Sequence, residues 1–223
     1  MRRLYRDWYE LVIARLSLVD GLTIELGSGI SRFREQYPSA VTTDVEPTPW
    51  TDHVADAHDL RFGDGVAANL VLIDVFHHLA RPSEFFAEAS RVLAPGGRVV
   101  IVDPYCSPLS YAAYRRFHHE RTDLSAPAFD DDPAAAASPL ASNQARTTLV
   151  FFRERAEYAR RWPLLPVVEA RRLAMLAYPL SGSFTRPQLV PNALYRPLRL
   201  VESALSPLAP LLAFRCLVVL ERR

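Results

Sequence analysis

The chain has 223 residues, of which 49% are hydrophobic and 23% charged, and its net charge is +1. This length suits one domain with insertions, and the balanced charge gives no reason to expect nucleic acid or an anionic membrane as a partner. All 26 basic residues are arginine, which excludes a lysine Schiff base or a P-loop lysine, and two cysteines are too few for a cysteine-rich zinc site.

No export signal or membrane span is predicted. Asp7 and Glu10 lie where a signal peptide needs an apolar run, and Pro210 and Arg215 break the longest apolar stretches near the end of the chain. We therefore expect a cytoplasmic protein, either a monomer or a homodimer. A peripheral membrane contact by residues 193–212 stays open as an alternative.

Helices and strands alternate along the first half of the chain. Residues 3–19 have apolar side chains at helical spacing and predict an amphipathic helix. From residue 22 to 103 the alternation predicts a doubly wound, parallel α/β sheet with helices on both faces. The expected strands are 22–26, 40–43, 53–55, 70–73 and 98–102, the expected helices are 32–37 and 82–93, and residues 95–97 are expected to form a turn.

The second half is less regular. Its expected helices are 107–121, 151–162 and 193–206, the last interrupted by Pro197, and its expected strands are 167–173 and 213–220. Residues 123–142, rich in Pro, Ala and Asp, predict a mobile loop. The segments 106–165 and 174–212 are longer than ordinary connections, so we interpret them as insertions that cover a substrate.

A glycine turn follows the first predicted strand, at Gly27-Ser28-Gly29. Glycines allow a ligand to approach the backbone closely, and the N-terminus of the next helix favours negative groups, although many strand-to-helix turns carry glycine. A dinucleotide fingerprint needs a third glycine where this chain has Arg32, which argues against NAD.

Three acidic residues lie at the ends of consecutive strands: Asp44, Asp56 and Asp74. The carboxyl ends of parallel strands meet at one edge, where ligands bind. An acid after the second strand can accept both ribose hydroxyls, and one after the third can accept the adenine amino group. Each acid alone fits a cap or turn equally well, but the ordered set favours a nucleoside site.

These features resemble those of a known family. The matching segments are IELGSG (24–29), TTDVE (42–46), VADAHDLRF (54–62), NLVLIDVFHHL (69–79) and RVLAPGGRVVIVDPY (91–105). Residues 22–103 resemble a class I S-adenosylmethionine-dependent methyltransferase of the small-molecule kind, the ubiquinone/menaquinone methyltransferase-like group with a type 11 domain. The resemblance implies one domain over residues 1–223, with a Rossmann-like sheet of seven mostly parallel strands and a cofactor-binding half at 21–105.

The resemblance also implies the cofactor, S-adenosyl-L-methionine, and its contacts. One departure is Ser31, where the family often has a further glycine. The implied contacts are Glu25, Gly27, Ser28 and Gly29 for the methionine part, Asp44 for ribose, Val45 for the adenine face, Asp56 and Ala57 for the adenine edge, and the Asp74-Val75 backbone for the methionine end.

Methyl transfer from a sulfonium mainly requires alignment of acceptor, methyl and sulfur, and an oxygen or carbon acceptor also benefits from a base. The candidate catalytic residues are His78, Tyr111, His118 and His119. Alternatively, His78 supports its loop, the other histidines suit a helix C-terminus, and the tyrosine packs in the core. No metal site is expected, because the acidic run 130–132 has no second ligand cluster at a recognisable spacing.

The sequence therefore predicts methyl transfer to an oxygen or carbon of a small, apolar or aromatic metabolite. Aromatic residues in the insertions, such as Phe151 and Trp162, would cover the acceptor, and Tyr5 or Tyr9 would close the site from the other side. The same aromatic residues fit a second core equally well. The alternative function is a non-catalytic S-adenosylmethionine-binding protein or a partner-binding module.

Overall fold

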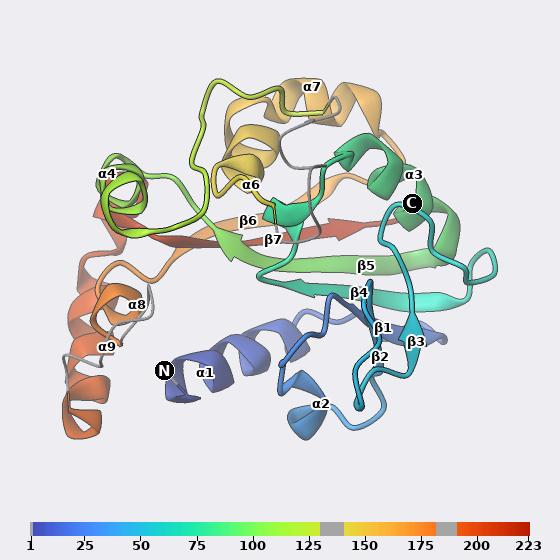
Figure 1. The fold of residues 1–223 in the computed structure, drawn as a ribbon, viewed down its shortest axis with the longest axis horizontal. Coiled ribbons are helices and arrows are strands. Elements are labelled where there is room, and N and C mark those ends of the chain that lie inside the picture. Colours follow the sequence, from blue (N-terminus) through green and yellow to red (C-terminus); the bar gives the residue numbers. More distant parts are fainter. Residues whose placement is uncertain (1, 130–140, 182–190) are drawn as a thin grey trace.

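The computed structural model describes residues 2–129, 141–181 and 191–223. In this part of the chain, seven strands form one sheet in the order β3-β2-β1-β4-β5-β7-β6 (Figure 1). Strands β1 to β5 pair in parallel, whereas β7 runs antiparallel to both β5 and β6. This confirms the predicted Rossmann-like class I architecture. The strands are β1 (Leu22–Leu26), β2 (Val41–Asp44), β3 (His53–Val54), β4 (Ala67–Ile73), β5 (Leu93–Pro104), β6 (Val167–Leu173) and β7 (Arg215–Glu221).

The central strands are buried on both faces and contribute side chains to two separate hydrophobic cores. Because side chains alternate along a strand, Leu70 and Leu72 of β4 face one core while Val71 faces the other. The first core lies between the sheet and the helices α3 (Pro82–Val92) and α7 (Arg155–Arg161), and the second lies between the opposite face and α1 (Arg2–Ile13) (Figure 1). The near-continuous apolar sequence of β4 and β5 follows from this double burial.

Helix α1 packs on the sheet through Leu4, Trp8 and Val12, which recur every four residues and are almost fully buried. The helix ends at Ile13, earlier than the predicted residue 19. The chain turns there because Ser17 is anchored to the sheet: its backbone N–H donates to Asn69 Oδ1 at 2.6 Å, and its hydroxyl donates to the Gly96 carbonyl at 2.7 Å.

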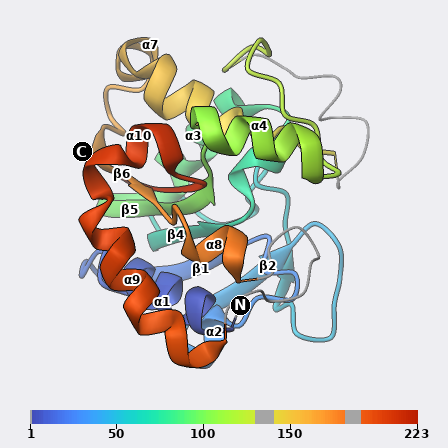
Figure 2. The same ribbon diagram turned by 90° about the vertical axis from the view of Figure 1, so that its left-hand side faces the viewer.

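Several helices gather at the end of the sheet where β4 and β5 finish (Figure 2). They are α4 (Pro108–Phe117), α8 (Ala177–Leu180), α9 (Tyr195–Ala204) and α10 (Ala209–Leu212). A capping box between Ser107 and Ser110 begins α4. Pro197 does not interrupt α9 as predicted, because it lies in the first turn, where a missing backbone N–H is tolerated. The remaining short helices are α2 (Phe33–Gln36), η1 (Phe76–His78), α6 (Arg146–Thr148), η2 (Leu149–Arg153), η3 (Asn192–Leu194) and η4 (Ser206–Leu208).

The predicted start of the fifth strand is also wrong. Strand β5 begins at Leu93 and includes residues 95–97, which were expected to form a turn. Gly96, with φ of 77°, and a register shift in β4 between Ala67 and Asn69 let the irregular segment stay in the sheet. Of the predicted loop 123–142, residues 130–140 lie outside the described residues, and the acidic run 130–132 lies there too.

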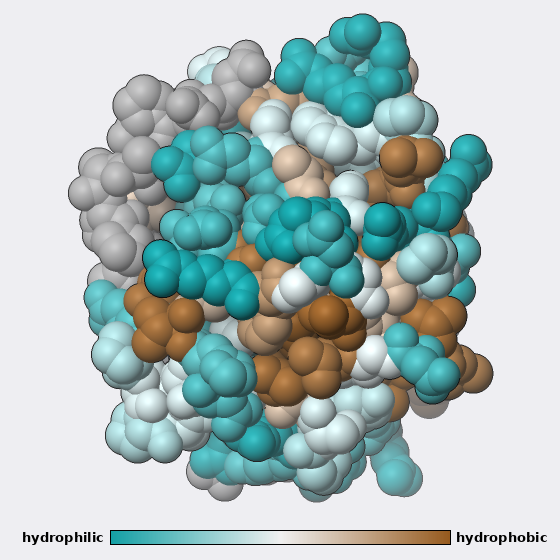
Figure 3. Space-filling model, turned by 90° about the vertical axis from the view of Figure 1, so that its right-hand side faces the viewer, coloured by the Kyte–Doolittle hydropathy of each residue, from teal (hydrophilic) through white to brown (hydrophobic). Residues whose placement is uncertain are grey.

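The opposite end of the molecule, at the amino ends of the parallel strands, carries apolar side chains among polar ones (Figure 3). Leu18, Leu22 and Val66 are exposed apolar residues of the segments that enter β1 and β4. Among the described residues, no helix combines the length and the apolar character needed to cross a membrane.

Candidate functional site

The turn after β1 presents bare backbone at the carboxyl edge of the sheet. Gly27 and Gly29 have φ angles of 64° and 43°, in the left-handed region that favours glycine. A Cβ at Gly27 would lie 2.7 Å from Val75 Cγ2, so any side chain there would collide with the turn after β4. The Ser28 and Gly29 backbone N–H groups donate to the end of β2, at the Thr43 carbonyl and Asp44 Oδ2, both at 2.8 Å.

A cavity of about 680 Å³ opens beside this turn. Residues 27–32 line one side with Ile73 and Asp74, and α1 lines the other with Tyr5 and Tyr9. The N-terminal helix therefore closes the cavity from the side expected for it. The volume lies within the range of about 300–1,000 Å³ of small-molecule sites. Among the described residues, the buried Ser28 hydroxyl has no hydrogen-bond partner, so a polar ligand atom would satisfy it.

Asp74, directly after β4, also lines the cavity. Its φ of 60° is unusual for a residue other than glycine, and the surroundings hold it there. The Tyr5 hydroxyl donates to Asp74 Oδ2 at 2.7 Å, and the Arg215 guanidinium forms an ion pair with Oδ1. The Arg215 guanidinium packs against the neighbouring rings of Trp8 and Tyr178, with its Cζ 5.0 and 5.1 Å from their centroids. Burial lowers the pKa of Arg215 to about 10, so it remains cationic at neutral pH.

Sequence reasoning missed Arg215. In the sequence this residue is marked only as an arginine at the start of an apolar strand. Its partners Trp8, Asp74 and Tyr178 all lie far from it in the chain. The antiparallel insertion of β7 between β5 and β6 brings it beside Asp74.

The other two predicted acids lie farther along the same edge. Asp44 Oδ1 accepts from the Glu46 backbone N–H at 3.2 Å, and Asp56 Oδ1 lies 2.6 Å from His58 Nδ1. Burial would raise the pKa of Asp56, but hydrogen bonds from His58 and its charge hold it below the usual value. Val45 is half-exposed and Ala57 is buried. These residues follow β2 and β3 and lie outside the lining of the 680 Å³ cavity.

Glu25 is buried in β1 beneath the glycine turn and does not line the cavity. Burial raises the pKa of its carboxyl to about 7, and the hydrogen bond from Ser31 opposes this rise. The Ser31 hydroxyl donates to Glu25 Oε1 at 2.5 Å. Ser31 lines the cavity itself, so the serine that departs from the family pattern links the buried carboxyl to the cavity wall.

A second polar cluster lies behind the turn after β4. The buried His77 ring is held between two carboxylates, with Nδ1 2.9 Å from Asp103 Oδ1 and Nε2 3.3 Å from Glu120 Oε2. Burial lowers the pKa of His77, but the two carboxylates outweigh it and raise the pKa to about 9. His77 is therefore a cation that joins the loop after β4 to the segment after α4. Burial and the neighbouring His77 lower the pKa of His78, which keeps that ring neutral at pH 7.

The helix expected to present catalytic groups turns away from the cavity. In α4, Tyr114 is fully buried and donates to the Phe214 carbonyl, so this face of the helix packs in the core. The helix ends at Phe117, and His118 continues in extended conformation with φ of −95° and ψ of 146°. Tyr111, His118 and His119 consequently do not line the cavity, and neither does His78.

The insertion aromatics pack mostly in cores. Phe151 is fully buried against Phe86 and Tyr158, and Trp162 packs at the edge of the same cluster. Phe151 and Trp162 both belong to the first core, with α3 and α7, so they neither form a separate second core nor line the cavity.

The order and directions of the strands are those of the class I, Rossmann-like methyltransferase fold. Residues 25–101 match the family model of a methyltransferase domain. Over this part of the chain the sequence is similar to a methyltransferase domain, and S-adenosyl-L-methionine is the cofactor of class I methyltransferases. No curated protein matches the chain.

Solved structures share the fold at low identity. A putative methyltransferase in complex with the Haloferax volcanii Trm112 activator is 18% identical with a TM-score of 0.54, over 96% of this chain and 88% of that one. The geranyl diphosphate C-methyltransferase of Streptomyces coelicolor is 14% identical with a TM-score of 0.57, over 100% and 82%. A putative methyltransferase from Bacillus halodurans is 15% identical with a TM-score of 0.52, over 96% and 97%.

Proposed function

We propose that the chain transfers a methyl group from S-adenosyl-L-methionine to an oxygen or carbon of a small metabolite. The observation that carries the proposal is the cavity enclosed by the glycine turn, Asp74 and α1. It combines backbone free of side chains, a buried hydroxyl in need of a partner and a fixed carboxylate, at the edge where open α/β sheets bind ligands.

The bound cofactor supplies a methyl group already activated on a sulfonium, so the chain has mainly to bind and align. In this proposal Gly27, Ser28 and Gly29 accommodate the methionine part, with Glu25 acting from beneath through Ser31. The Asp74-Val75 turn holds the methionine end. The remaining proposed contacts are Asp44 for ribose, Val45 for the adenine face, and Asp56 and Ala57 for the adenine edge.

The acceptor would approach between α1 and α9. A second cavity of about 840 Å³ lies there and shares Arg3 and Arg6 with the first. Arg196 and Arg199 of α9 also line it, together with Asp7, which forms an ion pair with Arg199. The excess of arginine over acid favours an acceptor with an anionic group. Tyr5, Tyr9 and Ile73 in the first cavity favour an apolar or aromatic body at the reacting end.

Alignment of the acceptor with the methyl group can by itself supply much of the rate enhancement, so a general base would increase the rate further without being essential. His78 is the best placed of the four proposed bases, because it lies four residues beyond Asp74 and carries a neutral ring. Tyr111, His118 and His119 reach the acceptor only if it extends toward α4. His77 is protonated at neutral pH and cannot serve as the base.

Isothermal titration with S-adenosylhomocysteine tests the binding step, and a panel of phenolic and carboxylate acceptors with labelled S-adenosylmethionine tests the transfer. We expect saturable binding and label transfer to at least one acceptor class. Absence of binding at millimolar ligand would refute the proposal. Binding without transfer to any acceptor would instead favour a cofactor-binding protein without turnover.

A further inference from the structure

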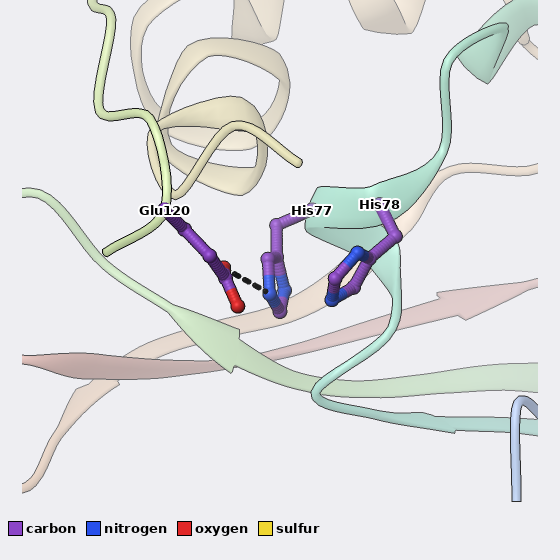
Figure 4. A group of neighbouring side chains, drawn as sticks. All are labelled: His77, His78 and Glu120. Atoms are coloured by element: carbon purple, nitrogen blue, oxygen red, sulfur yellow. Dashed lines mark ion pairs between the residues drawn. The ribbon is translucent and has the colours of Figure 1, made fainter. Parts of the chain in front are cut away.

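We propose that His77, His78 and Glu120 form a binding site for a divalent transition-metal cation of the zinc type. Two imidazoles and one carboxylate converge behind the turn after β4 (Figure 4), and one ligand atom from each lies within 4.8 Å of the others. Two histidines and one carboxylate are a ligand set that binds zinc with a fourth position left for water or substrate.

The separation of two of the ligands already matches such a site. Metal–ligand bonds of about 2.0–2.1 Å at a tetrahedral angle place two ligand atoms about 3.3 Å apart. His77 Nε2 and Glu120 Oε2 are 3.3 Å apart, across the ion pair drawn in Figure 4. In the metal-free chain a proton on Nε2 joins the two groups. A cation would take its place and release that proton to solvent.

The third ligand has to move only slightly. His78 Nδ1 contacts the Ala141 carbonyl at 3.3 Å, a long distance for a hydrogen bond, so little energy opposes rotation of the ring. The His77 and His78 ring centroids are 4.2 Å apart, and the rings lie beside each other on η1. Rotation about the His78 side chain would bring a ring nitrogen toward the position between His77 and Glu120.

The surrounding residues orient the ligands as in built metal sites. Asp103 accepts from His77 Nδ1, which leaves Nε2 for the metal, and the Thr147 hydroxyl donates to Asp103 in turn. The Ser142 hydroxyl and the Gln144 amide both donate to Glu120 Oε2, the oxygen that faces His77. A carboxylate behind the histidine and fixed donors on the glutamate are supporting contacts of the kind that hold metal ligands in place.

The site escaped sequence analysis because its ligands have no regular spacing. Two come from η1 and the third from the segment after α4, and only the folded chain brings them together. The inference does not depend on methyl transfer. A cation here would connect the carboxyl edge of the sheet to the insertion between β5 and β6.

The test is a titration of the chelator-treated full chain with Zn²⁺, and with Co²⁺ as a spectroscopic probe. We expect one cation per chain, a higher melting temperature, and visible Co²⁺ absorption typical of nitrogen and oxygen ligands. Loss of a supporting residue alone lowers metal affinity about 10–100-fold, so His78→Gln and Glu120→Gln should each lower it at least tenfold. His119→Gln, which changes an exposed neighbour of Glu120, should leave it unchanged.

Three results of the Co²⁺ titration would contradict the proposed metal site. Absence of binding by the wild-type chain, binding that survives both His78→Gln and Glu120→Gln, or loss of binding in His119→Gln would each overturn the assignment. His78 is half-buried and lies outside the His77 ion pairs, so its variant decides the matter if Glu120→Gln fails to fold. Far-UV circular dichroism establishes which variants are folded.

Discussion

The buried carboxyl of Glu25 should make the stability of the chain fall as the pH rises. Its pKa is about 7 in the folded chain against 4.5 for an ordinary glutamate. At about 1.4 kcal/mol per pKa unit, this difference corresponds to about 3 kcal/mol. Between these two values the folded state binds more protons than the unfolded state. The stabilisation is therefore complete below pH 4.5 and is lost as the pH rises through about 7.

Glu25→Gln removes the ionisation and keeps the shape of the side chain. The amide oxygen can still accept from Ser31, but the NH₂ group brings two hydrogen-bond donors into a buried position, which reduces the gain. We expect the variant to be more stable than wild type by about 1–3 kcal/mol near pH 8, and by much less near pH 5. Urea unfolding followed by circular dichroism at both pH values measures the difference.

Glu35→Gln is the matched control, because the Glu35 side chain is 64% exposed and should show no such pH-dependent gain. A stability difference between Glu25→Gln and wild type that is the same at both pH values would refute the reasoning. So would a variant that loses stability relative to wild type as the pH rises.

Three further predictions concern the proposed cofactor site. Gly27→Ala should lower the free energy of unfolding, measured with urea, by about 1–3 kcal/mol. Gly65 also has a positive φ but open space where a Cβ would lie, so Gly65→Ala should lower it less. Equal losses in the two variants would show that the collision with Val75 is not the cause. Tyr5→Phe should weaken S-adenosylhomocysteine binding by about 0.5–1.5 kcal/mol in isothermal titration, since Asp74 loses a hydrogen bond, and unchanged affinity would separate Tyr5 from the site. Asp44→Ala should weaken the same binding by about 1–3 kcal/mol, and an unaltered affinity would remove Asp44 from the ribose role.

The sheet could be predicted because the features that specify it lie within short stretches of sequence. Alternating apolar strands and helices, the glycines at 27 and 29, and acids at the ends of three consecutive strands are all features of short stretches of chain. The order of the strands follows from the topology of the class. The predicted end of the first helix failed because the anchor of Ser17 on Asn69 and Gly96 is a long-range contact that helical spacing does not contain.

The polar interior of the site could not be predicted in the same way. Arg215 reaches Asp74 from the last strand, and Glu120 reaches His77 from an insertion. A long insertion can return to the sheet in many ways, and nothing in its local sequence fixes which residue it brings. The backbone hydrogen bond from Asn143 to the His77 carbonyl, at 2.9 Å, is one contact that fixes it here.

A crystal structure of the chain with S-adenosylhomocysteine tests the central claim most directly. We predict ligand density in the 680 Å³ cavity, with the amino-acid end between the glycine turn and Tyr5 and the nucleoside toward Asp44. A ligand bound elsewhere on the molecule, or a cavity that stays free of ligand at saturating concentration, would contradict the account.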